Sequence, residues 1–150
     1  QEIQRLIGRS LRSITDLTNL GERQIKIDCD VIQADGGTRT ASISGGFVAL
    51  YLCVEKLKKN YNIQKPIIKN YIAAISAGIV ENKPLLDLNY EEDSLAEVDA
   101  NFVVCDSGEI SEIQVTGEEY FFSEEQYSNI FNLAKKGINE IIIEQKKILS

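Results

Sequence analysis

The sequence predicts an α+β protein in which a mostly antiparallel sheet and its helices form a two-layer sandwich. Three observations predict this class: apolar residues at helical spacing near both ends of the chain, short apolar or alternating segments between them, and tight turns that join neighbouring short segments into hairpins. The expected order is helix, strand, helix, four strands and helix, with the helices packed on one side of the sheet.

The composition fits one globular domain and narrows the chemistry open to it. The 150 residues carry a formal charge of −7 and no histidine, which excludes histidine catalysis and histidine metal ligation. Three cysteines without a CxxC pair indicate a reducing, cytoplasmic compartment. No apolar run approaches the ~20 residues of a membrane span, so we expect no membrane partner. An acidic chain is a poor non-specific binder of nucleic acid, and any polyanion site must therefore be local.

The first helix is predicted to run from the start of the chain to a stop at Gly21. Apolar residues keep helical spacing from Ile3 to Leu17. Three arginines share another face: Arg5, Arg9 and Arg12. That face is either a solvated or interfacial surface or a track for RNA. Because the helix begins at Gln1 without a capping residue or an initiator methionine, we expect an N-terminal portion to be missing.

The other elements follow from periodicity and turn residues. Residues 25–31 alternate strictly between apolar and polar, which is typical of a half-buried strand. Residues 43–57 carry apolar side chains at helical spacing and form the second helix. Four further strands pair as two hairpins: 71–80 with 85–90, and 101–105 with 110–115. Ser123 and Gln126 form a capping box that starts the long final helix.

A glycine-rich turn, Gly36 to Thr40, joins the first strand to the second helix. Glycines let backbone amides turn inward, and a helix N-terminus adds partial positive charge, so this turn suits an oxyanion. Thr38 can donate its hydroxyl and Arg39 offers a planar fork for phosphate. The alternative is a structural turn in which Arg39 pairs with a nearby acid.

The segment from Asp87 to Asp99 holds six acids and no base. Asp87 is expected within a strand, and Asp93 follows where the chain can fold back toward it. Two converging carboxylates can hold a hard divalent cation, and their repulsion raises the pKa of one of them enough for general acid catalysis. The alternative is a solvated acidic loop in which Asp93 or Ser94 caps a short helical turn.

Taken in order, several blocks resemble the ribonuclease PH family, phosphorolytic 3′-exoribonucleases that trim the 3′ ends of transfer RNA precursors. The matching blocks are residues 2–7, 28–31, 34–43, 87–94 and 96–99. The resemblance covers almost the whole chain but only the C-terminal two thirds of the family's usual length. We therefore expect residues 1–150 to form a single ribonuclease PH-like domain that lacks its N-terminal portion.

The resemblance implies a phosphate site at Gly37, Thr38 and Arg39, and a catalytic or Mg²⁺-binding carboxylate pair at Asp87 and Asp93. It implies Mg²⁺ as cofactor, inorganic phosphate as co-substrate and RNA as partner. It also implies a hexameric ring, a trimer of dimers, with RNA reaching the sites through the central opening. Phosphate would attack the 3′-terminal phosphodiester and release nucleoside diphosphates.

Two departures from the family pattern keep other functions open. The family's Gly-Gly-Arg-Thr run before the position of Gln1 and an earlier basic stretch are absent, so a separate N-terminal fragment is a further expected partner. Val115 stands where the family has a glycine, beside the last hairpin. One alternative is a truncated or degenerate ring subunit without catalysis, and another is a small binder of phosphate metabolites.

Overall fold

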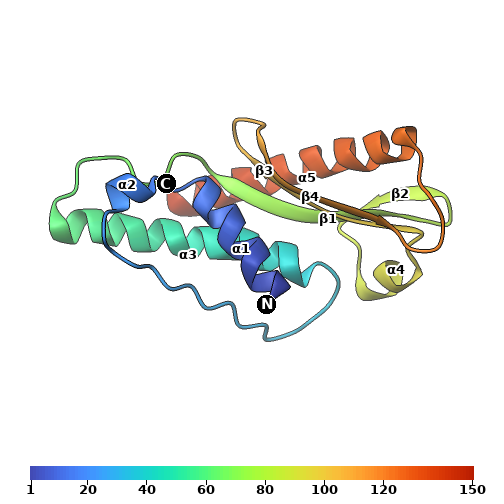
Figure 1. Cartoon of the computed structure of the whole chain (residues 1–150), viewed down its shortest axis with the longest axis horizontal. Coiled ribbons are helices and arrows are strands. Elements are labelled where there is room, and N and C mark those ends of the chain that lie inside the picture. Colours follow the sequence, from blue (N-terminus) through green and yellow to red (C-terminus); the bar gives the residue numbers. More distant parts are fainter.

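The computed structural model describes residues 1–150 and contains five helices and a four-stranded sheet (Figure 1). In chain order the elements are α1 (Glu2–Ser13), α2 (Leu17–Leu20), α3 (Thr38–Tyr61), β1 (Ile72–Val80), β2 (Lys83–Leu86), α4 (Tyr90–Leu95), β3 (Val98–Cys105), β4 (Ile110–Gly117) and α5 (Glu124–Leu149). Every strand pair is antiparallel, in the order β2-β1-β3-β4. The α+β class and the antiparallel sheet are confirmed. None of the helices is both long and apolar enough to cross a membrane.

Helices cover both faces of the sheet, so the protein has three layers and not the two that the sequence predicts. Ile72 and Ala74 of β1 pack with α1 and α3 in one core, while Ala73 and Ile75 pack against α5 in a second core. The reason is visible in β1, which is buried along eight of its nine residues. A continuous apolar run of this kind is typical of a strand covered on both sides.

The register of the central strands fixes which side chains share a face. β1 and β3 pair from Ile72 opposite Cys105 to Ile79 opposite Val98. β3 and β4 pair with an irregularity between Val103 and Val104. Val115 lies opposite Ala100 within β4 and packs toward the α5 core, so this side chain fits a regular strand.

The first predicted helix is two helices in the structure. α1 ends at Ser13, and Thr15 then forms an isolated antiparallel bridge with Ile68. Asp16 starts α2 by accepting a hydrogen bond from the amide of Asn19. The apolar spacing continues across the break because both helices pack on the same core, which is why periodicity alone missed it.

The arginine face of α1 contacts the sheet at one point. Arg9 Nε lies 2.7 Å from Glu112 Oε1 on β4, while Arg5 and Arg12 remain exposed. One of the three arginines therefore joins α1 to β4 within the chain.

The predicted strand over residues 25–31 is wrong, because these residues form a connecting segment that pairs with no strand. Ile25 and Ile27 still point into the core beside α1 and α3. Farther along, 46% of Val31 and 97% of Ile32 are exposed. Alternation predicts side-chain direction, whereas a strand also needs a partner strand for its amides and carbonyls. No other segment of the chain supplies one here.

Candidate functional site

The glycine-rich turn ends in an uncapped helix N-terminus. Gly37 is the residue before α3 and has a left-handed backbone, with φ of 77°. The amide of Ala41 makes the first bond of the helix to the Gly37 carbonyl, and no side chain caps this end. The amides of Thr38, Arg39 and Thr40 are thus the donors that a helix leaves unsatisfied at its start. Such an end attracts anions.

The first predicted carboxylate, Asp87, sits in a turn just after β2. The prediction that it lies within a strand is wrong, because β2 ends at Leu86 and Asp87 has φ of 56°. Ser76 of β1 fixes this turn twice: its carbonyl accepts from the Asp87 amide at 2.8 Å, and its Oγ accepts from the Leu88 amide at 3.2 Å. Leu88, the next residue along the chain, is buried.

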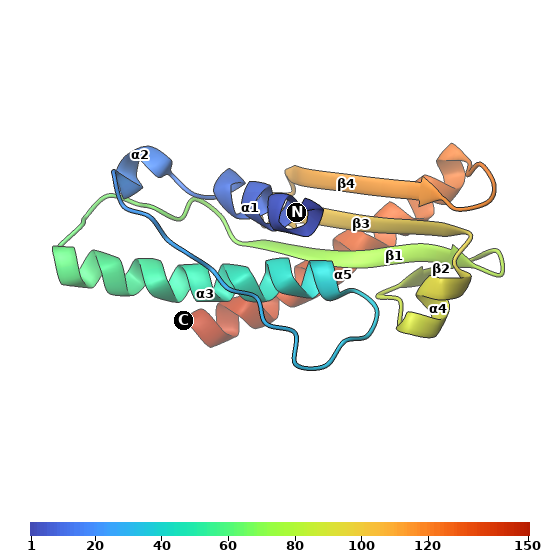
Figure 2. The same ribbon diagram turned by 60° about the horizontal axis from the view of Figure 1, so that its bottom comes forward.

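The glycine turn and the carboxylate turn are in direct contact. A Cβ at Gly36 would lie 2.0 Å from the Leu88 carbonyl oxygen, and one at Gly37 would lie 3.6 Å from Asp87 Oδ1. Figure 2 shows the loop before α3 reaching toward the segment between β2 and α4. Two predicted parts of the site, more than 45 residues apart in sequence, thus meet in space.

The second predicted carboxylate, Asp93, lies on the short helix α4. Asn89 caps this helix by accepting from the amide of Glu92, and the Glu92 side chain accepts from the Asn89 amide. The short helical turn of the alternative interpretation therefore exists, but its cap is Asn89 instead of Asp93 or Ser94. The Asp93 side chain is exposed and free to meet a ligand.

A third carboxylate, Asp99, belongs to the acidic segment but is not among the site residues that the sequence predicts. It is half-buried on β3, on the face that points away from the α5 core. Burial, the charge of Asp93 and the charge of Glu118 raise the pKa of Asp99, while Arg39 opposes the rise. These effects bring Asp93, Asp99 and Arg39 into one electrostatic neighbourhood. The sequence offers only a weak signal for it, an acid next to the apolar residues Val98 and Ala100 near the start of β3.

Arg39 has no carboxylate partner, since the four ion pairs of the structure involve other residues. The structural-turn alternative expected such a pair. Thr38 is engaged locally, because its hydroxyl donates to the Asp35 carbonyl at 3.1 Å. Arg39 is therefore the side chain at this helix end that is free to bind an anion.

The carboxylates suit a magnesium ion only together with other oxygen ligands. No group of three or more histidine, cysteine, aspartate or glutamate side chains is arranged as a metal cage. Mg²⁺ keeps several waters and commonly binds through one or two carboxylates plus substrate phosphates. Asp87 and Asp93, beside an anion-binding turn, supply only such a partial ligand set, which phosphate oxygens and water would have to complete.

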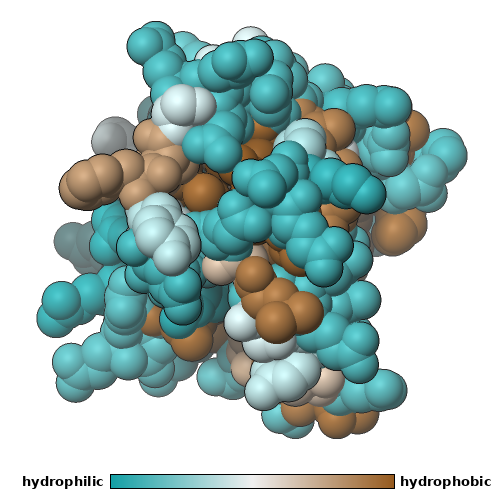
Figure 3. Space-filling view, turned by 90° about the vertical axis from the view of Figure 1, so that its right-hand side faces the viewer, coloured by the Kyte–Doolittle hydropathy of each residue, from teal (hydrophilic) through white to brown (hydrophobic).

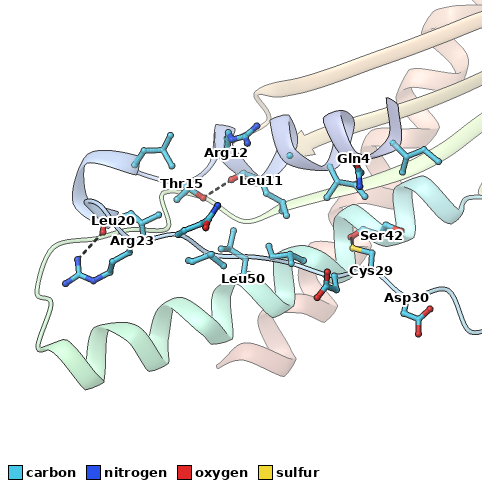
Figure 4. A pocket seen from close by; sticks show the side chains of 18 of the residues that line it. Gln4, Leu11, Arg12, Thr15, Leu20, Arg23, Cys29, Asp30, Ser42 and Leu50 are labelled. Atoms are coloured by element: carbon cyan, nitrogen blue, oxygen red, sulfur yellow. Dashed lines mark hydrogen bonds between the residues drawn. The ribbon is translucent and has the colours of Figure 1, made fainter. Parts of the chain in front are cut away.

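The candidate site is an open surface. Arg39, Asp87 and Asp93 are all exposed, and the end of the molecule around β2 and α4 is mainly hydrophilic (Figure 3). A cavity of about 720 Å³ lies beside it, between α1, residues 23–31 and α3 (Figure 4). Its lining is half hydrophobic and includes Thr38 of the predicted phosphate site, but not Arg39, Asp87 or Asp93.

Comparison with known proteins matches two sequence models of one family. Residues 1–54 match domain 1 of the 3′ exoribonuclease family, and residues 70–137 match domain 2. Ribonuclease PH of Bacillus pumilus is 57% identical over 148 residues, which cover 98% of this chain and 61% of that protein. The chain thus spans less than two thirds of the length of this relative.

Two solved structures share the fold. An archaeal exosome core has a TM-score of 0.74 at 18% identity and covers 97% of this chain and 62% of its own. The Archaeoglobus fulgidus exosome with RNA bound to the active site has a TM-score of 0.66 at 16% identity; the match covers 95% of this chain and 60% of that chain. These two likenesses concern the fold alone; the matched sequence models and the bacterial relative show that the chain belongs to the 3′ exoribonuclease family.

Proposed function

We propose that this chain carries the catalytic centre of a phosphate-dependent 3′-to-5′ exoribonuclease that trims the 3′ ends of transfer RNA precursors. One observation carries the proposal: an uncapped helix N-terminus with an unpaired arginine lies against a turn and a strand that bear carboxylates. The 57% identity to ribonuclease PH supports the same activity. The chemistry needs no histidine, because inorganic phosphate is already an anionic nucleophile near neutral pH.

The anion-binding turn would hold the attacking phosphate. Backbone amides at the start of α3 and the guanidinium of Arg39 would bind its oxygens, with Gly37 letting the backbone approach closely. Thr38 would contribute its amide while its hydroxyl stays bonded to the preceding turn. Phosphoryl transfer depends mainly on such positioning and on neutralising charge.

The carboxylates would serve the other side of the reaction. A phosphate oxygen forms a bond to the terminal phosphorus, the bond from that phosphorus to the 3′ oxygen of the preceding nucleotide breaks, and this oxygen takes up a proton. Asp99 is the candidate proton donor because it is half-buried on β3 near Asp93 and Arg39, and burial and Asp93 shift its pKa upward, the direction that this role needs. The products are a nucleoside diphosphate and an RNA shorter by one residue.

Asp87 and Asp93 would hold Mg²⁺ together with phosphate oxygens, and the ion would supply neutralisation of the charge that develops on those oxygens. Asp87 is oriented for this by the two hydrogen bonds through which Ser76 fixes its turn. Asp93 is oriented by α4 and its capping box.

The proposal includes the setting in which the site would work. RNA is the expected partner, and a hexameric ring built as a trimer of dimers is the expected assembly, supported by the exosome-like fold. Residues 1–150 are expected to act as one domain, because α3 and β1 share a core. A cytoplasmic location suits three cysteines that are all free.

The test is release of nucleoside diphosphates from a transfer RNA with a 3′ extension, with and without phosphate. Arg39→Ala should abolish phosphate-dependent release, while Arg23→Ala, which removes an arginine stacked on Tyr61 at the far end of α3, should leave it unchanged. Release that continues without phosphate would refute phosphorolysis. Turnover that is insensitive to Arg39→Ala would favour the alternative, a degenerate ring subunit without catalysis.

A further inference from the structure

Asp35, a carboxylate outside the predicted site, bridges the glycine turn and the start of α4. Its Oδ1 accepts from the amide of Gly36 at 2.8 Å and from the amide of Tyr90 at 2.7 Å, although Asp35 and Tyr90 are 55 residues apart. Both distances are short for bonds between an amide and an oxygen, as expected for a charged acceptor. One oxygen atom thus ties the start of the glycine turn to the start of α4.

Each end of this bridge leads to a residue of the proposed centre. Tyr90 is the first residue of α4, and one turn later the amide of Asp93 bonds to the carbonyl of Asn89. On the other side, the Asp35 carbonyl accepts from the Thr38 hydroxyl at the start of α3. The backbone and the side chain of Asp35 therefore hold the anion-binding turn and the carboxylate helix at the same time.

Asp35 supplies a hydrogen-bond acceptor for the start of α4 that neither α4 nor the glycine turn provides. Asn89 and Glu92 satisfy each other's amides, which leaves the Tyr90 amide as an unsatisfied donor at the start of α4. Gly36 packs so closely on the Leu88 carbonyl that there is no room for a side chain to fasten the two turns. The side chain of Asp35 connects them instead, through its hydrogen bonds to the amides of Gly36 and Tyr90.

We propose that Asp35 is a positioning residue of the phosphorolytic centre, which keeps the phosphate-binding turn in register with the carboxylates of α4. This inference rests on the proposed function. Asp35 itself does not touch the reacting atoms; it acts through Gly36, Thr38 and α4. The two amide bonds also lower the pKa of Asp35, so the carboxylate stays ionised and the bridge stays closed throughout the neutral range.

The test compares three variants of the chain. Asp35→Ala removes both bonds, Asp35→Asn keeps an oxygen acceptor, and Asp30→Ala removes an exposed acid of the same segment that makes no side-chain hydrogen bond or ion pair. Three experiments are made on each: calorimetry gives the phosphate affinity, phosphorolysis gives the phosphate KM and kcat, and hydrogen exchange is followed at the Tyr90 amide.

Asp35→Ala should weaken phosphate binding and raise the phosphate KM by about tenfold, the effect of losing roughly one charge-assisted hydrogen bond. Exchange at the Tyr90 amide should accelerate by a similar factor. Asp35→Asn should restore both to within about threefold because its oxygen can still accept, and Asp30→Ala should match the wild type.

Phosphate affinity that is unchanged in Asp35→Ala, with faster exchange at Tyr90, would overturn the inference, because the bridge would then matter only for folding. An equal loss of affinity in Asp30→Ala would also overturn it, since the effect would come from net charge. Failure of the wild-type chain to bind phosphate at all would instead refute the proposed function, and the positioning role with it.

Discussion

Replacing Gly36 by alanine tests whether contact between the two turns makes the site. The new Cβ would lie 2.0 Å from the Leu88 carbonyl oxygen and 2.8 Å from the carbonyl carbon of Asn89. Both atoms belong to the backbone, so no side-chain rotation relieves the clash. Because Cβ atoms essentially never approach another heavy atom closer than 3.0 Å, the turns must separate by about 1 Å.

Overpacking of this kind costs about 1–3 kcal/mol in the free energy of unfolding. The effect on the reaction should be larger, because Asp87 and α4 move together with Leu88 and a misplacement of about 1 Å can reduce a rate by about a hundredfold. Gly36→Ala should therefore be a folded protein of reduced stability with little phosphorolysis.

Gly45→Ala is the matched control, since a Cβ at Gly45 in α3 meets no atom within 4 Å. Removing a glycine from the interior of a helix should stabilise it by about 1 kcal/mol. Urea unfolding and nucleoside diphosphate release are measured for both variants. If Gly36→Ala keeps wild-type activity and stability, the contact between the turns does not position the centre.

Three further outcomes are expected. Asp99→Asn should raise the free energy of unfolding at neutral pH, because burial and Asp93 raise the pKa of Asp99 and so disfavour its ionised form. The gain should vanish below about pH 4, where the aspartic acid is protonated in both the folded and the unfolded state. A gain that stays constant with pH in urea titrations would contradict this. Arg39→Lys keeps the charge but loses the planar fork, so calorimetry should find phosphate affinity reduced by about tenfold. Ser44→Ala removes two hydrogen bonds to the backbone of β1 and should cost about 1–3 kcal/mol in urea unfolding. Ser42→Ala, whose hydroxyl bonds only its own helix, should cost far less.

The parts of the site that sequence reasoning found have local signals. The glycines at positions 36 and 37 predict a tight turn before a helix. Ser123 and Gln126, three residues apart, predict the start of α5 because they form a capping box. The choice of Asp87 and Asp93 came from a dense run of acids together with the family resemblance. Their place beside the glycine turn follows from Ser76 and Leu88, which no local pattern could connect to that turn.

The parts that sequence reasoning missed depend on distant partners. The residues from 25 to 31 alternate as a strand does, yet strand formation is decided by a partner's amides and carbonyls, and none lies alongside. Asp35 reads as an ordinary turn residue, because its second bond goes to an amide 55 positions away. Asp99 becomes distinctive only once the register of β3 shows which face it occupies.

That register also explains why the site lies where it does. On the face covered by α1 and α3, β1 presents the apolar residues Ile72 and Ala74, followed by Ser76 and Gly78. The paired positions of β3 change in the same way, from Cys105 and Val103 to the polar residues Asn101 and Asp99. Ser44 fastens α3 to β1 at Ala74, the last apolar position of this row, so the helix begins where the sheet turns polar. The opposite face of the same strands stays apolar beneath α5. A polar patch on one face of a doubly covered sheet is costly to bury unless its groups are hydrogen-bonded, as the buried Ser76 is to the Leu88 amide, or are reached by water, as the half-buried Asp99 is. The change from apolar to polar along one face therefore creates the opening that the anion-binding turn and the carboxylates share.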